Sequence, residues 1–129
     1  MTRSKYMRSV AVIGITLLAL SACSSSSDDN KATGPLKIGT LLPETGSLAF
    51  LGPPEVAAVD LAVQDINAAG GVLGQDVEVL KGDSGDTTTE IAQTTVDSHL
   101  AAGVSAIVGA ASSSVSFTVI DKITAAGVV

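Results

Sequence analysis

Short apolar runs separated by turn-forming residues dominate the sequence from residue 36 onward. Residues 36–42 have the length and apolar content of a β-strand, residues 75–83 alternate Val77 and Val79 with Asp76 and Glu78 as a strand does, and residues 104–109 form a further apolar run. The third is apolar almost throughout, which is typical of a strand in the centre of a sheet. Residues 127–129 begin another run of the same kind. We therefore expect four strands.

Between these runs, apolar residues recur three or four positions apart, which indicates helices with one buried face. The predicted faces are Val56, Val59, Val63 and Ile66 in the first helix, Ala92, Val96 and Leu100 in the second, and Val115, Val119, Ile123 and Ala126 in the third. Strand and helix thus alternate along residues 36–129.

Residues that are favourable at helix ends mark where two of these helices begin and stop. Pro53 and Pro54 can open the first helix, because its first turn does not need the N–H groups that proline lacks. The two glycines at residues 70–71 can end it in a left-handed conformation. Thr87, with Glu90 three positions later, fits a capping box for the second helix.

This alternating order predicts an α/β fold with a doubly wound parallel sheet. Right-handed connections between parallel strands place helices on both faces of the sheet. In such folds, ligands bind beyond the carboxyl ends of the strands. The loops that follow the first three strands are rich in Gly, Ser and Thr, so we expect a binding site there. Because residue 129 falls within an apolar pair, we expect residues 36–129 to be the incomplete, N-terminal part of a lobe.

Residues 1–22 have the pattern of a secretory signal peptide. A basic start precedes an apolar run at residues 10–20, which is shorter than the roughly 20 residues that span a bilayer. The run leads into Leu-Ser-Ala-Cys, which ends at Cys23 and resembles the bacterial lipobox, in which the cysteine receives a diacylglyceryl group and becomes the mature N-terminus. The alternative is an unmodified cysteine behind a generic signal peptide. Residues 23–35 are polar and Ser-rich, which is typical of a flexible linker.

The composition narrows the class of protein. The chain has 129 residues, 46% of them hydrophobic, and a formal net charge of −6, so it offers no basic surface for nucleic acid. Because Cys23 is its one cysteine, it cannot form an intrachain disulfide. Its aromatic residues are Tyr6, Phe50 and Phe117. Val, Ile, Leu and Ala must therefore supply the core.

Three consecutive serines, Ser112, Ser113 and Ser114, follow the third predicted strand and open the third predicted helix. Their hydroxyls can donate and accept hydrogen bonds, and the helix start adds unpaired N–H groups and a positive dipole end. This combination suits a carboxylate, an amide or another polar ligand group. The alternative is ordinary N-capping, for which one serine would suffice.

Other candidates for chemistry are weaker. His99 lies within a predicted helix with no evident catalytic partner, so we expect a solvated or packed histidine. Asp83 and Asp86 lack the spacing of a calcium loop, and we interpret them as surface turn residues. Glu44 could meet a ligand ammonium group or be a solvated loop residue. We predict no catalytic residue, no metal and no cofactor.

Four stretches of the sequence together resemble a known family. They are KIGTLLPETGSLAFLG at residues 37–52, AAVDLAVQDINAAGGVLG at 57–74, VSAIVGAASSSV at 104–115 and ITAAGVV at 123–129. These stretches resemble the N-terminal lobe of the branched-chain amino-acid binding proteins of bacterial ABC transporters, which have the type I periplasmic-binding-protein fold. The INAAGGVLG element, between the first predicted helix and the second predicted strand, is quite specific to this family.

This resemblance implies a set of ligand-binding residues. They are Gly46, Leu51, Ala111, Ser112, Ser113 and Ser114. Ser113 matches the family's ligand-binding serine, which grips the α-carboxylate or α-ammonium group of an amino acid. The loop that contains Gly46 and Leu51 matches a segment along the other side of the ligand. Leu51 stands where the family can carry an aromatic residue.

The resemblance also implies a function. It is that of an extracytoplasmic solute-binding lipoprotein, anchored to the cell membrane through Cys23, that captures a branched-chain or other small amino acid or an amide and delivers it to an ABC permease. A second lobe beyond residue 129 is part of this expectation. The alternative is a ligand-sensing receptor domain of the same fold. An enzyme is a third hypothesis, which no nucleophile–base pair or nucleotide motif supports.

Overall fold

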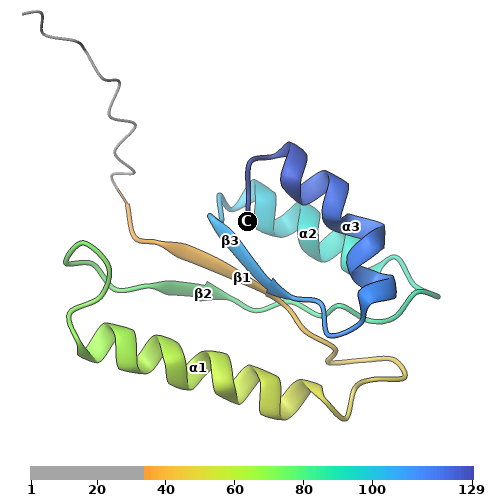
Figure 1. Cartoon of the computed structure of the whole chain (residues 1–129), viewed down its shortest axis with the longest axis horizontal. Coiled ribbons are helices and arrows are strands. Elements are labelled where there is room, and N and C mark those ends of the chain that lie inside the picture. The colour runs from red at the N-terminus through yellow and green to blue at the C-terminus, as the bar shows by residue number, and fades with distance from the viewer. Residues whose placement is uncertain (1–33) are drawn as a thin grey trace, which may run out of the picture. The chain divides into compact units, whose positions relative to one another are not determined.

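The computed structural model describes residues 34–129, in which strands and helices alternate (Figure 1). The elements are β1 (Lys37–Leu41), α1 (Gly52–Ala68), β2 (Glu78–Leu80), α2 (Ile91–Ala101), β3 (Ala106–Gly109) and α3 (Ser113–Ala125). None of these helices is both long enough and apolar enough to cross a membrane. The predicted signal peptide, Cys23 and most of the predicted linker lie outside the described residues.

The three strands form a parallel sheet in the order β2-β1-β3. Ile38 of β1 pairs with Val79 on one side and with Ala106 on the other, and Leu41 pairs with Gly109 at the end of β3. Helix α1 lies on one side of the sheet, and α2 and α3 lie on the other (Figure 1). The structure therefore confirms the predicted doubly wound α/β fold.

The predicted fourth strand is present only as two hydrogen bonds. The N–H of Ile107 donates to the carbonyl of Val129 at 2.7 Å, and the N–H of Val129 donates to the carbonyl of Ser105 at 3.3 Å. No strand is assigned over residues 127–129. Val129 nevertheless pairs with the outer edge of β3, where a fourth parallel strand would lie.

The core is built between the sheet and the two helices α2 and α3. Its buried members are Leu41, Ala92, Val96, Val115, Val119 and Ile123. The predicted faces of the second and third helices are thus confirmed, with one exception. Ala126 caps the end of α3 and is exposed, because the helix has already ended when the face would reach the sheet again.

Helix α1 is much less buried than its sequence pattern predicts. Val56, Val59 and Val63 are only half-buried, and Ile66 is 39% exposed. Within residues 34–129, α1 is the one helix on its side of the sheet (Figure 1), so no second helix packs beside it. The end signals of α1 are confirmed, because its prolines occupy the first turn and the glycines at residues 70–71 have positive φ.

The predicted capping box at the start of α2 is wrong. The N-cap residue is Glu90 rather than Thr87, and no side chain caps the helix. Thr88 instead donates its N–H and its hydroxyl to the Asp86 carboxylate, at 2.9 Å and 2.6 Å. This local hydrogen bonding holds residues 86–89 in a turn, which delays the helix to Ile91.

His99 is packed inside the domain, as one of the two sequence interpretations predicted. The residue is 3% exposed, and its Nε2 lies 2.8 Å from the carbonyl oxygen of Thr40. Gly39 leaves the space for the ring, since a Cβ there would lie 2.6 Å from Cδ2 of His99. The contact fixes α2 against β1.

Asn67, near the end of α1, makes a two-point contact with the chain entering β2. Its amide donates to the carbonyl of Val77 at 3.1 Å, and its side-chain oxygen accepts the N–H of Val77 at 2.7 Å. Val77 is buried, so its backbone groups have no easy access to water. The contact therefore ties the loosely packed α1 to the sheet.

We predict that Asn67→Ala lowers the free energy of unfolding by about 1–3 kcal/mol, because it leaves both backbone groups of Val77 unpaired. Chemical denaturation measures this change. Gln64→Ala, at an exposed position of the same helix, is the control and should change stability by less than about 0.5 kcal/mol. Equal stabilities of the two variants would contradict the prediction.

Candidate functional site

Two loops emerge side by side from the carboxyl edge of the sheet. Because Leu41 and Gly109 are paired at the ends of β1 and β3, the loop at residues 42–51 and the turn at residues 110–112 start next to each other. Parallel pairing thus places the two predicted halves of the site at one edge, where doubly wound folds bind ligands.

Gly109 makes the sharp departure from β3 possible. Its φ is +141°, a conformation that other residues rarely adopt, and a Cβ there would collide with the carbonyl of Leu41. The chain then passes through Ala110 and Ala111 and enters α3 at Ser113. A glycine at this position therefore sets where the serines lie relative to the sheet.

The three serines lie at the start of α3, as predicted. Ser112 is the N-cap residue, with φ −98° and ψ 122°, but no side-chain hydrogen bond caps the helix. Ser113 and Ser114 are exposed in the first turn. Ser112 therefore occupies the N-cap position, as the capping alternative predicts, but its hydroxyl does not make the capping hydrogen bond. The start of α3 therefore exposes the hydroxyls of Ser113 and Ser114 beside the N–H groups of its first turn.

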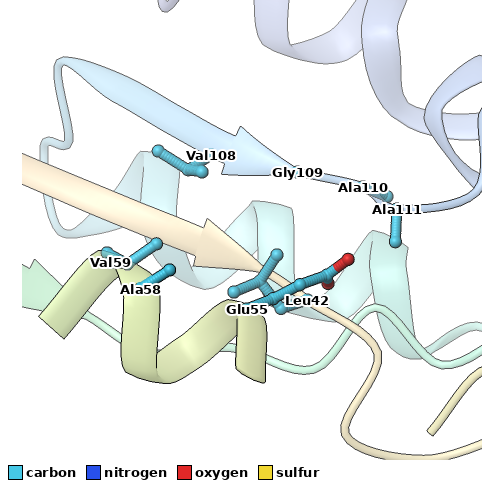
Figure 2. Close-up of a pocket in the computed structure, with 8 residues that line it drawn as sticks. All are labelled: Leu42, Glu55, Ala58, Val59, Val108, Gly109, Ala110 and Ala111. Carbon is cyan, nitrogen blue, oxygen red and sulfur yellow. The ribbon is translucent and has the colours of Figure 1, made fainter. Parts of the chain in front are cut away.

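A groove of about 440 Å³ runs between α1 and the end of β3 (Figure 2). Its lining is mostly apolar and comprises Leu42, Glu55, Ala58, Val59, Val108, Gly109, Ala110 and Ala111. Ala111 is the one predicted site residue in this lining. Val108 is 42% exposed along the groove, so the face of β3 toward α1 is only partly covered.

Glu55 is a candidate functional residue that the sequence analysis missed. It is the charged residue of the groove, and its Oε2 is buried without a hydrogen-bond partner in residues 34–129. Figure 2 shows its carboxyl group extending from α1 toward Ala110 and Ala111. The available signal was an acidic residue directly after Pro53 and Pro54, in the first turn of a helix.

A second hollow, of about 460 Å³, lies beside the loop that follows β1. Its lining comprises Glu44, Ala49, Gly52, Pro53, Val56 and Lys81. Gly46 and Leu51 lie in the same loop but do not line the hollow. The structure therefore brings the two predicted halves of the site to one edge of the sheet, but not into one shared pocket, and the ligand-binding roles of these residues stay predictions.

The loop at residues 43–51 is held by two aspartates that the sequence analysis interpreted as surface turn residues. One oxygen of Asp83 accepts the N–H groups of Glu44, at 2.9 Å, and Thr45, at 3.1 Å, and the other accepts the Thr45 hydroxyl. Asp86 accepts the N–H of Ser47 at 3.3 Å. Both residues do lie in turns, but their carboxylates connect the loops that follow β1 and β2.

These hydrogen bonds also set the pKa values of the two carboxyl groups. Burial acts to raise the pKa of Asp83, but the hydroxyl of Thr45 and the N–H groups of Gly85, Thr45 and Glu44 together hold it below its ordinary value. For Asp86, the hydroxyl and N–H of Thr88 lower the pKa, and the N–H of Ser47 adds to the effect. Both groups are therefore held in the ionised form that accepts these bonds.

A parallel α/β sheet with glycine- and serine-rich loops at its carboxyl edge defines the class of the domain as a doubly wound one. The model of the family described as "Periplasmic binding protein" matches residues 35–129. This chain belongs to that family, and its described part has the type I periplasmic-binding-protein fold. The family consists of solute-binding proteins rather than enzymes, and it indicates an extracytoplasmic location.

Individual relatives agree with this assignment. The chain is similar to "Leu/Ile/Val-binding protein homolog 7" of Brucella abortus (strain 2308), with 35% identity over 77 residues, which are 60% of this chain and 19% of the relative. It is also similar to "Leu/Ile/Val-binding protein homolog 8" of Brucella suis biovar 1, with 40% identity over 68 residues, covering 53% and 17%. The chain thus matches about a fifth of the length of these curated relatives.

Among solved structures, the chain is similar to the branched-chain amino acid transporter substrate binding protein LivJ from Streptococcus pneumoniae, in complex with isoleucine. The TM-score is 0.67 and the sequence identity is 40%, over 74% of this chain and 27% of that chain. The predicted resemblance to branched-chain amino-acid binding proteins is therefore confirmed.

We predict that acid weakens the contribution of Asp83 to stability. Because its folded-state pKa is lowered, the stabilisation is present above the unfolded value of about 3.8 and is lost as the pH falls through the folded value. Asp83→Asn should therefore destabilise the chain by up to about 1 kcal/mol at pH 7, and by less below about pH 4. Denaturation curves from pH 7 to pH 3 measure the difference.

Asp121→Asn, at an exposed position of α3, is the control for a change of one charge. A difference between the Asp83 variant and the unmodified chain that stayed constant down to pH 3 would contradict the prediction.

Proposed function

We propose that this chain is the N-terminal part of an extracytoplasmic solute-binding lipoprotein that serves an ABC importer. It captures a branched-chain amino acid, or another small amino acid or amide, and delivers it to a permease. The observation that carries this proposal is the likeness to LivJ in complex with isoleucine, which extends over 74% of this chain at 40% identity.

The geometry of the carboxyl edge supports an amino acid as the ligand. The start of α3 offers N–H groups and the exposed hydroxyls of Ser113 and Ser114, which suit an α-carboxylate. The groove beside it is mostly apolar and holds one carboxylate, that of Glu55. Donors for a carboxylate and apolar surface for an aliphatic side chain thus occur at the same edge of the sheet.

In this proposal, a second lobe supplies the residues that complete the ligand-binding site. The chain covers 27% of the LivJ chain and 19% of the Brucella abortus relative. Gly46, Leu51 and the serine turn form one wall, and a second lobe supplies the opposite wall. Closure of two lobes around a ligand would then exclude water from it.

The proposal also includes a lipid anchor at Cys23, after removal of residues 1–22. The lipobox-like sequence before Cys23 and the polar residues after it support this role. Each buried methylene of an acyl chain contributes about 0.8 kcal/mol of membrane affinity, so two chains anchor stably where one does so only marginally. Residues 24–35 would then tether the domain to the outer side of the membrane.

We predict that Ser113→Ala weakens ligand binding by about 1–3 kcal/mol, because it removes a hydrogen-bond partner from a desolvated carboxylate or ammonium group. Calorimetry on the product of the complete reading frame, with leucine, isoleucine and valine in separate titrations, measures the effect. Ser98→Ala, at an exposed position of α2, is the matched control and should leave affinity unchanged. If Ser113→Ala binds as tightly as the unmodified protein, the role of this serine is wrong.

We predict that Cys23→Ala releases the protein from membranes and abolishes lipid attachment, because the variant lacks the sulfur that forms the thioether. Cell fractionation and intact-mass spectrometry measure the two effects. Ser26→Ala, within the same polar stretch, should behave like the unmodified protein. A membrane-bound, unlipidated Cys23 in the unmodified protein would contradict the proposal.

A further inference from the structure

The loop at residues 43–51 is joined to the sheet by carboxylates rather than by strand pairing. Regular backbone pairing continues past β1 only as far as Leu42, whose N–H donates to Gly82 at 3.0 Å and whose carbonyl accepts from Ser84 at 2.8 Å. Leu42 and Asp83 form an isolated parallel bridge at this point. Beyond it, the side chain of Asp83 takes over the connection between the two loops.

Asp83 is fixed by four hydrogen bonds that converge on its carboxylate. Three come from the N–H groups of Glu44, Thr45 and Gly85, the last at 2.8 Å, and the fourth comes from the Thr45 hydroxyl. Gly85 belongs to the loop after β2, whereas Glu44 and Thr45 belong to the loop after β1. Three of these bonds fall on Oδ1 and one on Oδ2, and together they hold the two loops in one relative position.

Asp86 makes a second connection three residues further along. Its Oδ1 is held by Thr88, and its Oδ2 accepts the N–H of Ser47. Gly46 has φ +85°, and a Cβ there would lie 2.7 Å from Oδ2 of Asp86. Gly46 is therefore glycine for two reasons, which are its backbone conformation and the close approach of this carboxylate.

Polar groups near the two aspartates do not compete with them for the loop. Lys81 forms an ion pair with Asp60 of α1, at 2.6 Å, and so its ammonium group is engaged away from the two aspartates. Lys81 and Glu44 both line the second hollow. The ring of His99 lies beneath Gly82 and is engaged with Thr40. The ionised carboxylates of Asp83 and Asp86 are thus left to the N–H and hydroxyl donors of the two loops.

We propose that Asp83 and Asp86 are positioning residues for ligand binding, which hold the loop bearing Gly46 and Leu51 in its binding conformation before a ligand arrives. This inference rests on the proposed function, in which that loop forms one wall of the site. A loop that is already ordered does not lose conformational entropy on binding, so affinity is higher. Neither aspartate needs to touch the ligand for this role.

Hydrogen exchange followed by mass spectrometry tests the first part of the inference, on the 129-residue chain without ligand. In Asp83→Ala and Asp86→Ala, peptides covering residues 43–51 should exchange about tenfold faster. Asp83→Asn should give an intermediate rate, because it keeps one oxygen acceptor for the N–H groups of Glu44 and Thr45. Asp121→Ala, an exposed aspartate of α3, is the matched control and should not change the loop.

Unchanged exchange of this loop in both alanine variants would overturn the inference. Exchange that rises equally over the whole domain, with no excess at residues 43–51, would also overturn it, since the aspartates would then act on global stability and not on the loop.

Calorimetric titration with isoleucine tests the second part, on the product of the complete reading frame and well below its melting temperature. The alanine variants should bind about five- to tenfold more weakly, and Asp83→Asn should recover part of the affinity. Unchanged affinity despite a faster-exchanging loop would overturn the positioning role. If the unmodified protein binds no leucine, isoleucine or valine, the proposed function fails instead, and the exchange experiment still decides whether the carboxylates hold the loop.

Discussion

The parallel pairing of β1 between β2 and β3 is the constraint on which the rest of the structure depends. Parallel strands in register end at the same edge, and here the pairs Leu41–Gly109 and Leu42–Asp83 fix that edge to within a residue. Each strand is then followed by a loop that starts at this edge and leads into a helix. The candidate site is therefore a consequence of strand register, and its chemistry depends on what the loops carry.

The two sides of the candidate site are held by different forces. The serine turn is fixed through α3, whose Val115, Val119 and Ile123 lie in the apolar core. The loop after β1 is packed only at Pro43; its residues 44–47 are exposed, and Phe50 within it is 71% exposed. Its position depends on charged hydrogen bonds, which are directional and respond to solution conditions. The serine turn thus shares the stability of the core, whereas the stability of the loop after β1 depends on its own hydrogen bonds.

The sequence pattern was sufficient for the order of the elements, because helical and strand periodicities are set by which residues face the core. The pattern failed where the structure is decided by local side-chain hydrogen bonds, or by the absence of a neighbouring helix within residues 34–129. At residues 87–90, hydrogen bonds to Asp86 displaced the predicted capping box. Val56 to Ile66 fit a buried face, yet burial depends on neighbouring helices, which periodicity does not report. Asp83 and Asp86 belong to contacts between loops nearly 40 positions apart, and no local pattern encodes such contacts.

Helix α1 packs only loosely against the sheet, and this has a consequence for how the domain moves. The helix begins at Gly52, which is buried against the backbone of Pro43, and near its other end the amide of Asn67 bonds to Val77. Between these points, its half-buried valines and the ion pair of Asp60 with Lys81 hold it against the sheet. Segments with little buried apolar surface open at lower free energy than the core does. Outward motion of the middle of α1, which requires the solvent-exposed pair of Asp60 with Lys81 to open, would then widen the groove beside Val59 and Val108 while both ends of the helix stay attached.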